Sequence, residues 1–270
     1  MQYKVKAGDA NGSGAGVSPG RSYDRLSRVT MREGWEAEAQ NWARLARTPG
    51  LDHYHQDINL PPFLDLLPGP GRRTLDLACG EGRVGRVLAS LGHRVVGVDA
   101  SPTMVRLAAT HQRPEAAVLA DAARLPFPDE AFDLVVAYMC LHDIDAMPHA
   151  VAEAARVLGR SGRLCAAIPH PVHTAGGFQV PEAAAPYVIS GSYLDPARSD
   201  WVFDRGGVRM TFHSAHRPLE SYARALEAGG LLIEAIREPQ PPGYVVARDP
   251  AARRWRRIPL FLHLRAVKPG

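Results

Sequence analysis

A glycine-rich turn between a short strand and a helix constrains the fold of this chain more than any other feature. The segment TLDLACGEGRVG occupies residues 74–85. Its three glycines let the backbone approach a ligand closely, and the free N–H groups of a helix N-terminus follow them. A strand, a glycine turn and a helix in this order predict the first βα unit of a parallel sheet, with a ligand site at the turn.

Further strands and helices alternate along the chain. We predict strands over residues 73–78, 93–98, 116–120, 132–138 and 161–168, helices over 81–91, 102–110 and 147–158, and finally a helix over 218–228 with strands over 231–236 and 259–267. Residues 132–138 are almost all apolar, which is typical of a strand buried on both faces, and Ser101 is the expected N-cap of the second helix. The alternation predicts an α/β fold with a Rossmann-like, doubly wound, mostly parallel sheet of seven strands.

Composition divides the chain into four regions. We expect a flexible arm over residues 1–20, an N-terminal helical cap over 21–70, a Rossmann-like core over 71–168 and 217–270, and an insertion over 169–216. The arm contains a Gly, Ser and Pro run that buries little apolar area. In the cap, apolar spacing predicts helices over 35–47 and 62–67. The insertion is too long for a plain connection, so we expect it to form a substrate-binding lid.

The overall composition is that of an ordinary globular protein, with 46% hydrophobic and 22% charged residues. No apolar run is long enough to span a bilayer, and the first twenty residues contain no signal-peptide pattern. The three cysteines are widely spaced and include no C-x-x-C pair, which argues against disulfides and structural zinc. We therefore expect a cytoplasmic protein with reduced, buried thiols and no metal; the oligomeric state, monomer or homodimer, stays open.

The charge beside the glycine turn separates two classes of ligand. Gly80, Gly82 and Gly85 spell the G-x-G-x-x-G pattern of dinucleotide-binding enzymes, so an NAD(P)-dependent oxidoreductase is one alternative. Asp76 ends the preceding strand, where a carboxylate would repel a pyrophosphate. It would attract the ammonium of S-adenosylmethionine, a ligand without phosphate, and in a low-dielectric cleft the difference is on the order of several kcal/mol. The charge favours S-adenosylmethionine.

Four segments in the expected order resemble the class I S-adenosylmethionine-dependent methyltransferases, over about residues 60–267. They are DLACGEG (76–82), VGVDASPTM (96–104), ADA with LPFP (120–128) and FDLVVAY (132–138). The first has Ala78 where glycine is commoner in the family. The resemblance implies S-adenosylmethionine as methyl donor and S-adenosylhomocysteine as product.

The same resemblance implies roles for single residues. Asp99 would accept both ribose hydroxyls, Met104 would pack on the adenine, and Asp121 would accept from the exocyclic amine. As an alternative, either aspartate could simply cap a turn. The expected cofactor-binding residues are Asp76, Ala78, Gly80, Gly82, Asp99, Ala100, Met104, Asp121, Ala122 and Tyr138.

The acceptor side carries aromatic and titratable residues. Trp42, Tyr54, Phe178 and Trp201 are expected to enclose a flat acceptor. A base is needed only if the acceptor loses a proton, and the candidates are Tyr23, His55 and His170. The segments GSYL (191–194) and MTFH (210–213) resemble actinobacterial tailoring methyltransferases, including those that act on tryptophan-derived cyclic dipeptides. We therefore expect a small aromatic, indole-containing acceptor methylated at carbon, nitrogen or oxygen.

Two further alternatives stay open. The segment RRWRR at residues 253–257 is a basic cluster around a tryptophan, which an RNA-modifying methyltransferase would use. We expect it instead to be a solvated loop between the last two strands, because the chain contains no separate RNA-binding module. A cofactor-binding protein without catalytic activity is the other alternative.

Overall fold

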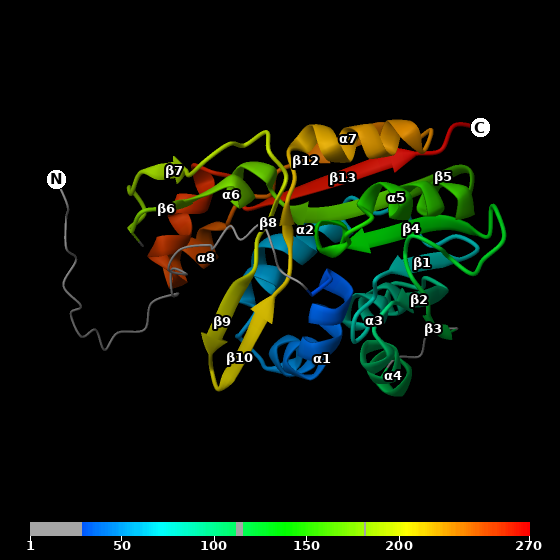
Figure 1. Ribbon diagram of the computed structural model, residues 1–270, viewed down its shortest axis with the longest axis horizontal. Helices are drawn as coiled ribbons and strands as arrows, with labels where there is room; N and C mark the ends of the chain where they lie inside the picture. The colour runs from blue at the N-terminus through cyan, green and yellow to red at the C-terminus, as the bar shows by residue number, and fades with distance from the viewer. Residues whose placement is uncertain (1–28, 112–115, 181) are drawn as a thin grey trace.

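Seven strands form one central sheet, as predicted (Figure 1). The computed structural model describes residues 29–111, 116–180 and 182–270, so the predicted arm over 1–20 and the candidate base Tyr23 lie outside the described residues. The strands are β1 (Thr74–Leu77), β2 (Val95–Asp99), β3 (Ala116–Leu119), β4 (Phe132–Tyr138), β5 (Leu158–Pro169), β12 (Leu232–Arg237) and β13 (Phe261–Val267). Their order is β12-β13-β5-β4-β1-β2-β3, and only β13 runs antiparallel to both neighbours. The predicted α/β, mostly parallel fold is confirmed.

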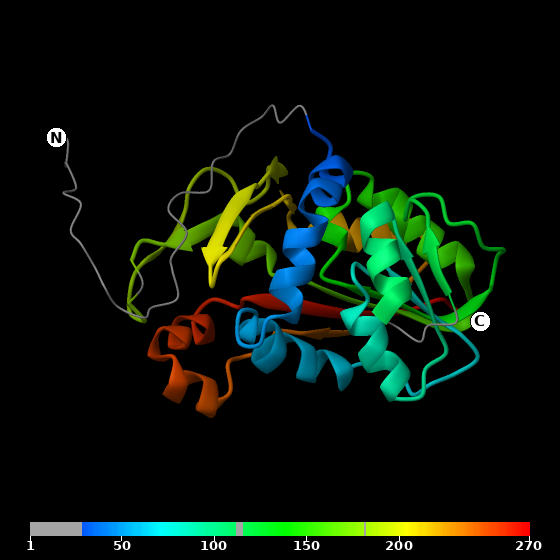
Figure 2. The ribbon, with the colours of Figure 1, turned by 90° about the horizontal axis from the view of Figure 1, so that it is seen from below.

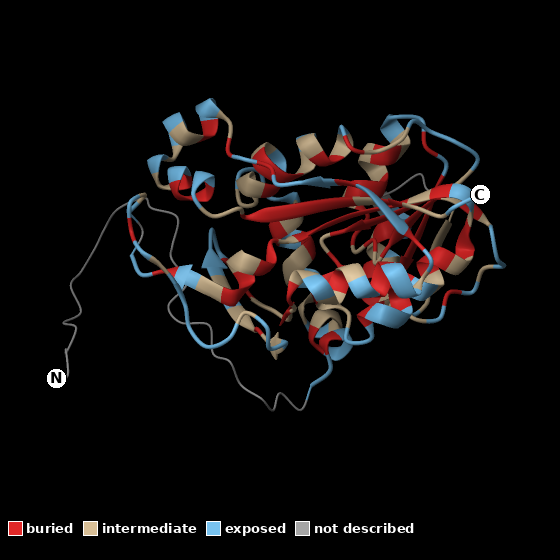
Figure 3. Cartoon of the chain, turned by 90° about the horizontal axis from the view of Figure 1, so that it is seen from above, coloured by how far each residue is buried: buried red, intermediate tan, exposed pale blue. Residues whose placement is uncertain are grey.

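Helices cover both faces of this sheet. One face packs against α2 (Leu60–Leu64) and α3 (Arg83–Ser90), and the other against α5 (Met147–Val157) and α7 (Leu219–Ala228). Figure 3 shows the central strands almost wholly in the buried colour. Strand β1 lies between β4 and β2. The helices that follow β1 and β4, which are α3 and α5, pack on opposite faces of the sheet, so a crevice opens at the carboxyl ends of these two strands.

Two local predictions match the structure closely. Strand β4 has the predicted bounds, and all of its residues except Asp133 are buried. Helix α4 (Pro102–His111) begins where expected, and the Met104 N–H donates to Ser101 Oγ at 3.0 Å. A side-chain cap satisfies an N–H group that the first helical turn would otherwise leave without a partner.

The N-terminal helices differ from their predicted bounds. Helix α1 (Met31–Arg47) begins four residues earlier than expected, because Thr30 and Glu33 form a capping box. The second predicted helix, over 62–67, is wrong in its bounds: a π-helical turn (His55–Asn59) leads directly into α2. No hydrophobic period in the sequence indicates a π turn, which forms here around the buried Ile58 and Asn59.

The predicted solvated loop before the last strand is wrong. The chain there forms α8 (Gly243–Arg248) and a 3₁₀ helix (Pro250–Arg256). Trp255 is buried among apolar residues that include Phe178, and the guanidinium of Arg254, also buried, lies 5.0 Å from the Trp255 ring centroid. Because Arg254 and Trp255 are buried, they do not belong to an exposed basic patch for RNA.

The insertion over residues 169–216 contains regular structure. Helix α6 (Pro171–Ala175) is followed by three two-stranded sheets within the described residues: β6 (Gly176–Phe178) with β7 (Tyr187–Ile189), β8 (Ala197–Arg198) with β11 (Ala215–His216), and β9 (Trp201–Arg205) with β10 (Val208–Phe212). Figure 2 shows α1, in blue, between the yellow hairpin β9–β10 and α4, and both contacts are close. The insertion therefore packs on the N-terminal helix.

Three compositional expectations bear on the structure. Cys79, Cys140 and Cys165 are buried free thiols, as predicted. Across the described residues, no helix combines the length and apolar character needed to cross a bilayer. In the same part of the chain, no group of three or more His, Cys, Asp or Glu side chains is placed to hold a metal ion; the absence of a metal stays a prediction.

Candidate functional site

A cavity of about 1290 Å³ opens at the carboxyl ends of β1, β2 and β4 and extends under the insertion. Pockets for one drug-sized ligand measure roughly 300–1,000 Å³, so this cavity has room for a cofactor and an acceptor together. Nine of the ten predicted cofactor residues line it: Asp76, Ala78, Gly80, Asp99, Ala100, Met104, Asp121, Ala122 and Tyr138. Gly82 does not line the cavity.

The glycine turn has a left-handed backbone at three positions. The φ angles of Ala78, Gly80 and Gly82 are +51°, +58° and +86°. Gly82 is the N-cap of α3, so its role in the structure is conformational. The angle at Ala78 explains why glycine would be favoured there, since a residue with a Cβ loses about 1–2 kcal/mol in this region.

Asp99 ties the end of β2 to the glycine turn. One carboxylate oxygen accepts the Gly80 N–H at 2.8 Å, and the other accepts the Ser101 N–H at 2.8 Å. Burial raises the pKa of Asp99, backbone hydrogen bonds oppose this shift, and Glu36 adds to it. A carboxylate has about four acceptor positions, so both oxygens can still accept ribose hydroxyls.

Asp76 is a buried carboxylate with one oxygen that lacks a hydrogen-bond partner among the described residues. Burial, together with the charge of Asp99 and against the opposing hydrogen bond from the Gly85 N–H, raises its pKa to about 7. An unpaired buried carboxylate is unfavourable unless a cation reaches it.

The residues present fit S-adenosylmethionine better than a dinucleotide. Asp76, Asp99 and Glu36 place three carboxylates near the turn. The ammonium of S-adenosylmethionine would meet Asp76, whereas a pyrophosphate would face repulsion from all three.

Of the residues predicted to contact the adenine, Asp121 also has a local role in capping a turn. Asp121 is exposed, and one of its carboxylate oxygens accepts the Ala123 N–H at 2.8 Å, so the turn-capping alternative is observed. Ala122 and Met104 are buried. The other Asp121 oxygen has acceptor capacity for an exocyclic amine, and that contact stays a prediction.

The structure separates the two described base candidates. His55 is buried, lines the cavity, and its Nδ1 lies 2.9 Å from the Tyr138 hydroxyl. Burial and the charge of Arg83, opposed by Asp52, lower the pKa of His55 to about 4. His170 does not line the cavity: it accepts the Val172 N–H as the cap of α6 and pairs with Glu238 at 2.9 Å. These are the contacts of a helix cap.

Helix α1 contributes a positioning residue that sequence reasoning missed, Glu36, which does not itself line the cavity. Glu36 accepts hydrogen bonds from the hydroxyls of Ser101 and Thr103, next to Asp99. The only sequence signal is an acid on the polar face of an amphipathic helix, because its partners lie more than sixty residues away. Glu36 fixes α1 across the end of the cofactor half of the cavity.

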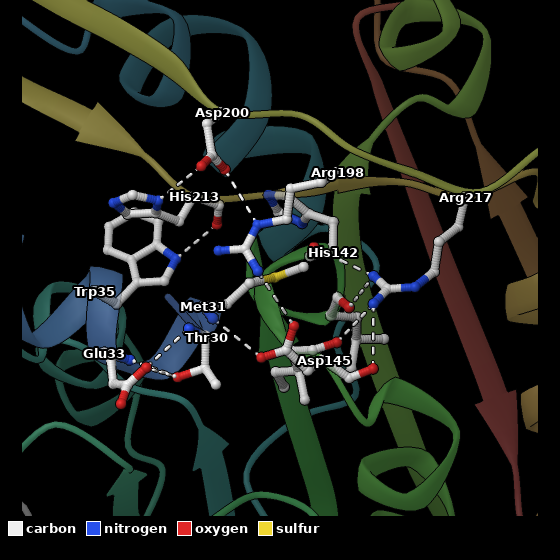
Figure 4. Close-up of polar contacts among 12 residues, drawn as sticks. Thr30, Met31, Glu33, Trp35, His142, Asp145, Arg198, Asp200, His213 and Arg217 are labelled. Carbon is white, nitrogen blue, oxygen red and sulfur yellow. Dashed lines mark hydrogen bonds and ion pairs between the residues drawn. The ribbon is translucent and has the colours of Figure 1, made fainter. Parts of the chain in front are cut away.

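A polar network holds the insertion against α1 and the turn after β4 (Figure 4). Asp145 accepts the Met31 N–H at 3.0 Å and pairs with Arg198, which also pairs with Asp200. Trp35 donates to the His213 carbonyl at 2.9 Å. The network joins three segments that are distant in the sequence, and two of its residues, Trp35 and Asp145, line the cavity.

Glu81, in the glycine turn, forms a buried ion pair with two arginines. Its side chain is fully buried, 2.9 Å from Arg47 of α1 and 2.7 Å from Arg86 of α3. We expect Glu81→Gln to lower the free energy of unfolding by about 1–3 kcal/mol, because charge-assisted hydrogen bonds are lost. Chemical denaturation measures this. The matched control is Glu234→Gln, whose carboxylate also pairs with two arginines but is 25% exposed and should matter less. Equal losses of unfolding free energy in Glu81→Gln and Glu234→Gln would contradict the larger stabilising role of the buried Glu81 ion pair.

Comparisons with known proteins agree with this geometry. A family model described as a methyltransferase domain matches residues 75–166. The ubiquinone biosynthesis O-methyltransferase of a Methylobacterium species is 30% identical over 193 residues, which cover 68% of this chain and 71% of that protein. The demethylmenaquinone methyltransferase of Beutenbergia cavernae is 35% identical over 159 residues; these are 54% of this chain but only 65% of the relative's length.

A solved structure supports the fold. The S-adenosylmethionine-dependent methyltransferase from Mesorhizobium loti superposes with a TM-score of 0.65 at 24% identity, covering 77% of this chain and 96% of that one. The oxidoreductase alternative finds no support in these relatives. The fold, the cofactor half of the cavity and the relatives agree: the chain belongs to the class I S-adenosylmethionine-dependent methyltransferases.

Proposed function

We propose that the protein transfers a methyl group from S-adenosylmethionine to a flat aromatic small molecule. The observation that carries the proposal is the aromatic lining of the cavity beyond the cofactor residues. One wall comes from α1 and the hairpin β9–β10, and the other from the turn after α1, β6, the 3₁₀ helix and β13. The residues are Trp35, Trp201 and Phe212 on the first wall, with Trp42 at its cofactor end beside Gly80, and Tyr54, Phe178, Trp255 and Phe261 on the second.

Two aromatic walls suit a planar acceptor. Trp201 and Phe212 are stacked with ring centroids 4.1 Å apart, and Trp42 meets Phe212 edge-on. Such packed rings hold their positions and offer apolar surface to a flat ligand. We assign residues 169–216, together with α1, to the acceptor side.

Bound S-adenosylmethionine supplies an already activated methyl group. The chain must then hold the acceptor in line, exclude water and, for a hydroxyl or N–H acceptor, accept a proton. We assign to His55 both the alignment of the acceptor and, for a hydroxyl or N–H acceptor, the acceptance of the proton. The pKa of about 4 keeps its ring neutral at physiological pH and therefore able to accept a hydrogen bond, although it limits its strength as a base.

An acceptor screen tests the function. Purified protein is incubated with methyl-labelled S-adenosylmethionine and quinols, phenols, indoles with cyclic dipeptides, aliphatic amines and acids, and tRNA. The names of the relatives point to quinols, and the sequence resemblance points to indoles. We expect transfer to an aromatic class. Transfer to tRNA or aliphatic compounds alone would contradict the proposal.

His55→Gln should lower turnover of such an acceptor about 10²-fold and leave the affinity for S-adenosylhomocysteine unchanged, because an acceptor out of line reacts slowly. The control is His170→Gln, which should retain turnover within a few fold. At saturating cofactor, His55 should cause no fall in turnover between pH 8 and 5.5, since its pKa lies near 4. A lower affinity of His55→Gln for S-adenosylhomocysteine would mean that His55 belongs to the cofactor half of the cavity, and would contradict its assignment to the acceptor half.

A further inference from the structure

The amino-acid end of S-adenosylmethionine carries a carboxylate as well as an ammonium. Asp76 accounts for the ammonium. The carboxylate would lie in the same region, where Asp99 and Glu36 repel it. A partly buried anion among like charges requires hydrogen-bond donors.

The backbone of the glycine turn offers few of these donors. The Cys79 N–H donates to the Val98 carbonyl at 2.9 Å, and the Gly82 N–H donates to the Cys79 carbonyl at 3.0 Å. The Gly80 N–H is held by Asp99. Three N–H groups of the turn are therefore already engaged, and side chains near the turn are the additional source of donors.

Trp42 brings an indole N–H to this turn from α1. A Cβ placed on Gly80 would lie 3.3 Å from Trp42 Nε1, so the indole nitrogen lies directly over the turn. The ring is held edge-on against Trp35 and Phe212, with centroids 5.8 and 6.0 Å apart. Trp42 also lines the cavity.

Arg83 brings a positive charge to the same place. Its guanidinium carbon lies 4.7 Å from the Trp42 ring centroid, and one terminal nitrogen pairs with Asp52 at 2.7 Å. The Arg83 side chain is mostly buried, and it lines the cavity. A guanidinium has five N–H donors, so the bond to Asp52 leaves others.

We propose that the Trp42 indole N–H and the Arg83 guanidinium together bind the carboxylate of the cofactor's methionine part. The inference rests on the cofactor and is independent of the acceptor. It also gives α1 a role in binding, because Trp42 reaches the turn only when α1 lies across it.

The test compares ligands with and without the carboxylate. Trp42→Phe keeps an aromatic side chain, although a smaller one, and removes the indole N–H, so we expect its affinity for S-adenosylhomocysteine to fall about 3- to 10-fold. Affinity for 5′-deoxy-5′-methylthioadenosine, which lacks the amino-acid part, should not change. The matched control Trp201→Phe, at another tryptophan in the cavity, should leave both affinities unchanged.

A measurement on the unaltered protein does not depend on how a variant folds. Decarboxylated S-adenosylmethionine keeps the ammonium and lacks the carboxylate, so it should bind at least about tenfold more weakly than S-adenosylmethionine. Trp42→Phe should reduce that ratio. The proposal would be overturned if Trp42→Phe lowered the affinities for S-adenosylhomocysteine and 5′-deoxy-5′-methylthioadenosine equally. It would also be overturned if the unaltered protein bound S-adenosylmethionine and decarboxylated S-adenosylmethionine equally well. Failure of the unaltered protein to bind S-adenosylhomocysteine would overturn the cofactor assignment as well.

Discussion

Asp76→Asn should weaken binding of S-adenosylhomocysteine by about 2–3 kcal/mol, or roughly 30- to 150-fold. The substitution keeps the shape of the side chain and removes the charge that meets the ligand's ammonium. Calorimetric titration at pH 8, where the carboxylate with its pKa of about 7 is mostly ionised, measures the loss. Affinity for 5′-deoxy-5′-methylthioadenosine should stay the same, because that ligand has no ammonium.

The same variant should be more stable without ligand. In the unfolded chain the pKa of Asp76 returns to its ordinary value near 3.8, whereas in the folded protein it is about 7. The group therefore costs the native state increasing free energy as pH rises from about 4 to 7, and the full cost applies above pH 7. We expect Asp76→Asn to raise the free energy of unfolding at pH 8 by about 2–4 kcal/mol.

Denaturation at several pH values checks this sign. The stability gain of Asp76→Asn should shrink as pH falls from 8 towards 4. An unchanged affinity for S-adenosylhomocysteine would remove the electrostatic argument for the cofactor. A gain in stability that does not vary with pH would mean that the buried charge is not its cause.

Asp99→Ala should weaken the binding of S-adenosylhomocysteine by about 1–3 kcal/mol, or roughly 5- to 150-fold, because it removes charge-assisted hydrogen bonds to the ribose. The ribose is common to both nucleosides, so the affinity of this variant for 5′-deoxy-5′-methylthioadenosine should fall by a similar factor. This distinguishes Asp99 from Asp76, which should affect only the ligand with the amino-acid part.

Asp99 also holds the Gly80 and Ser101 N–H groups, so a structural effect needs a control. Asp99→Asn keeps one acceptor oxygen and should lose less affinity than Asp99→Ala. If Asp99→Ala binds both nucleosides normally, the ribose assignment is wrong.

Sequence patterns predicted the elements whose signals are local. The bounds of β4 follow from a nearly continuous apolar run, and α4 follows from Ser101 as N-cap with Pro102 at the first turn. The cofactor half was predictable for a related reason, since its residues lie at or shortly after strand ends in one stretch of chain, between Asp76 and Tyr138.

Features set by distant contacts were not predictable. The 3₁₀ helix near Trp255 forms because its residues bury against Phe178, nearly eighty positions earlier. In the sequence, Glu36 has no feature that distinguishes it from a surface acid, because its partner Thr103 lies in α4 and contacts it only when α1 packs against α4. His170 looked like a base after β5, but its ring caps α6 instead. In each case the chemistry depends on a partner that no local pattern identifies.

The most direct test of the account is calorimetric titration of the ligand-free protein with S-adenosylhomocysteine at pH 8 and pH 6, and with NADH. Because Asp76, with a pKa of about 7, must be ionised to hold the ammonium, we expect S-adenosylhomocysteine to bind about tenfold more weakly at pH 6 and to release protons there. NADH should not bind. Binding of NADH without S-adenosylhomocysteine would contradict the account, and pH-independent binding of S-adenosylhomocysteine would contradict the role of Asp76.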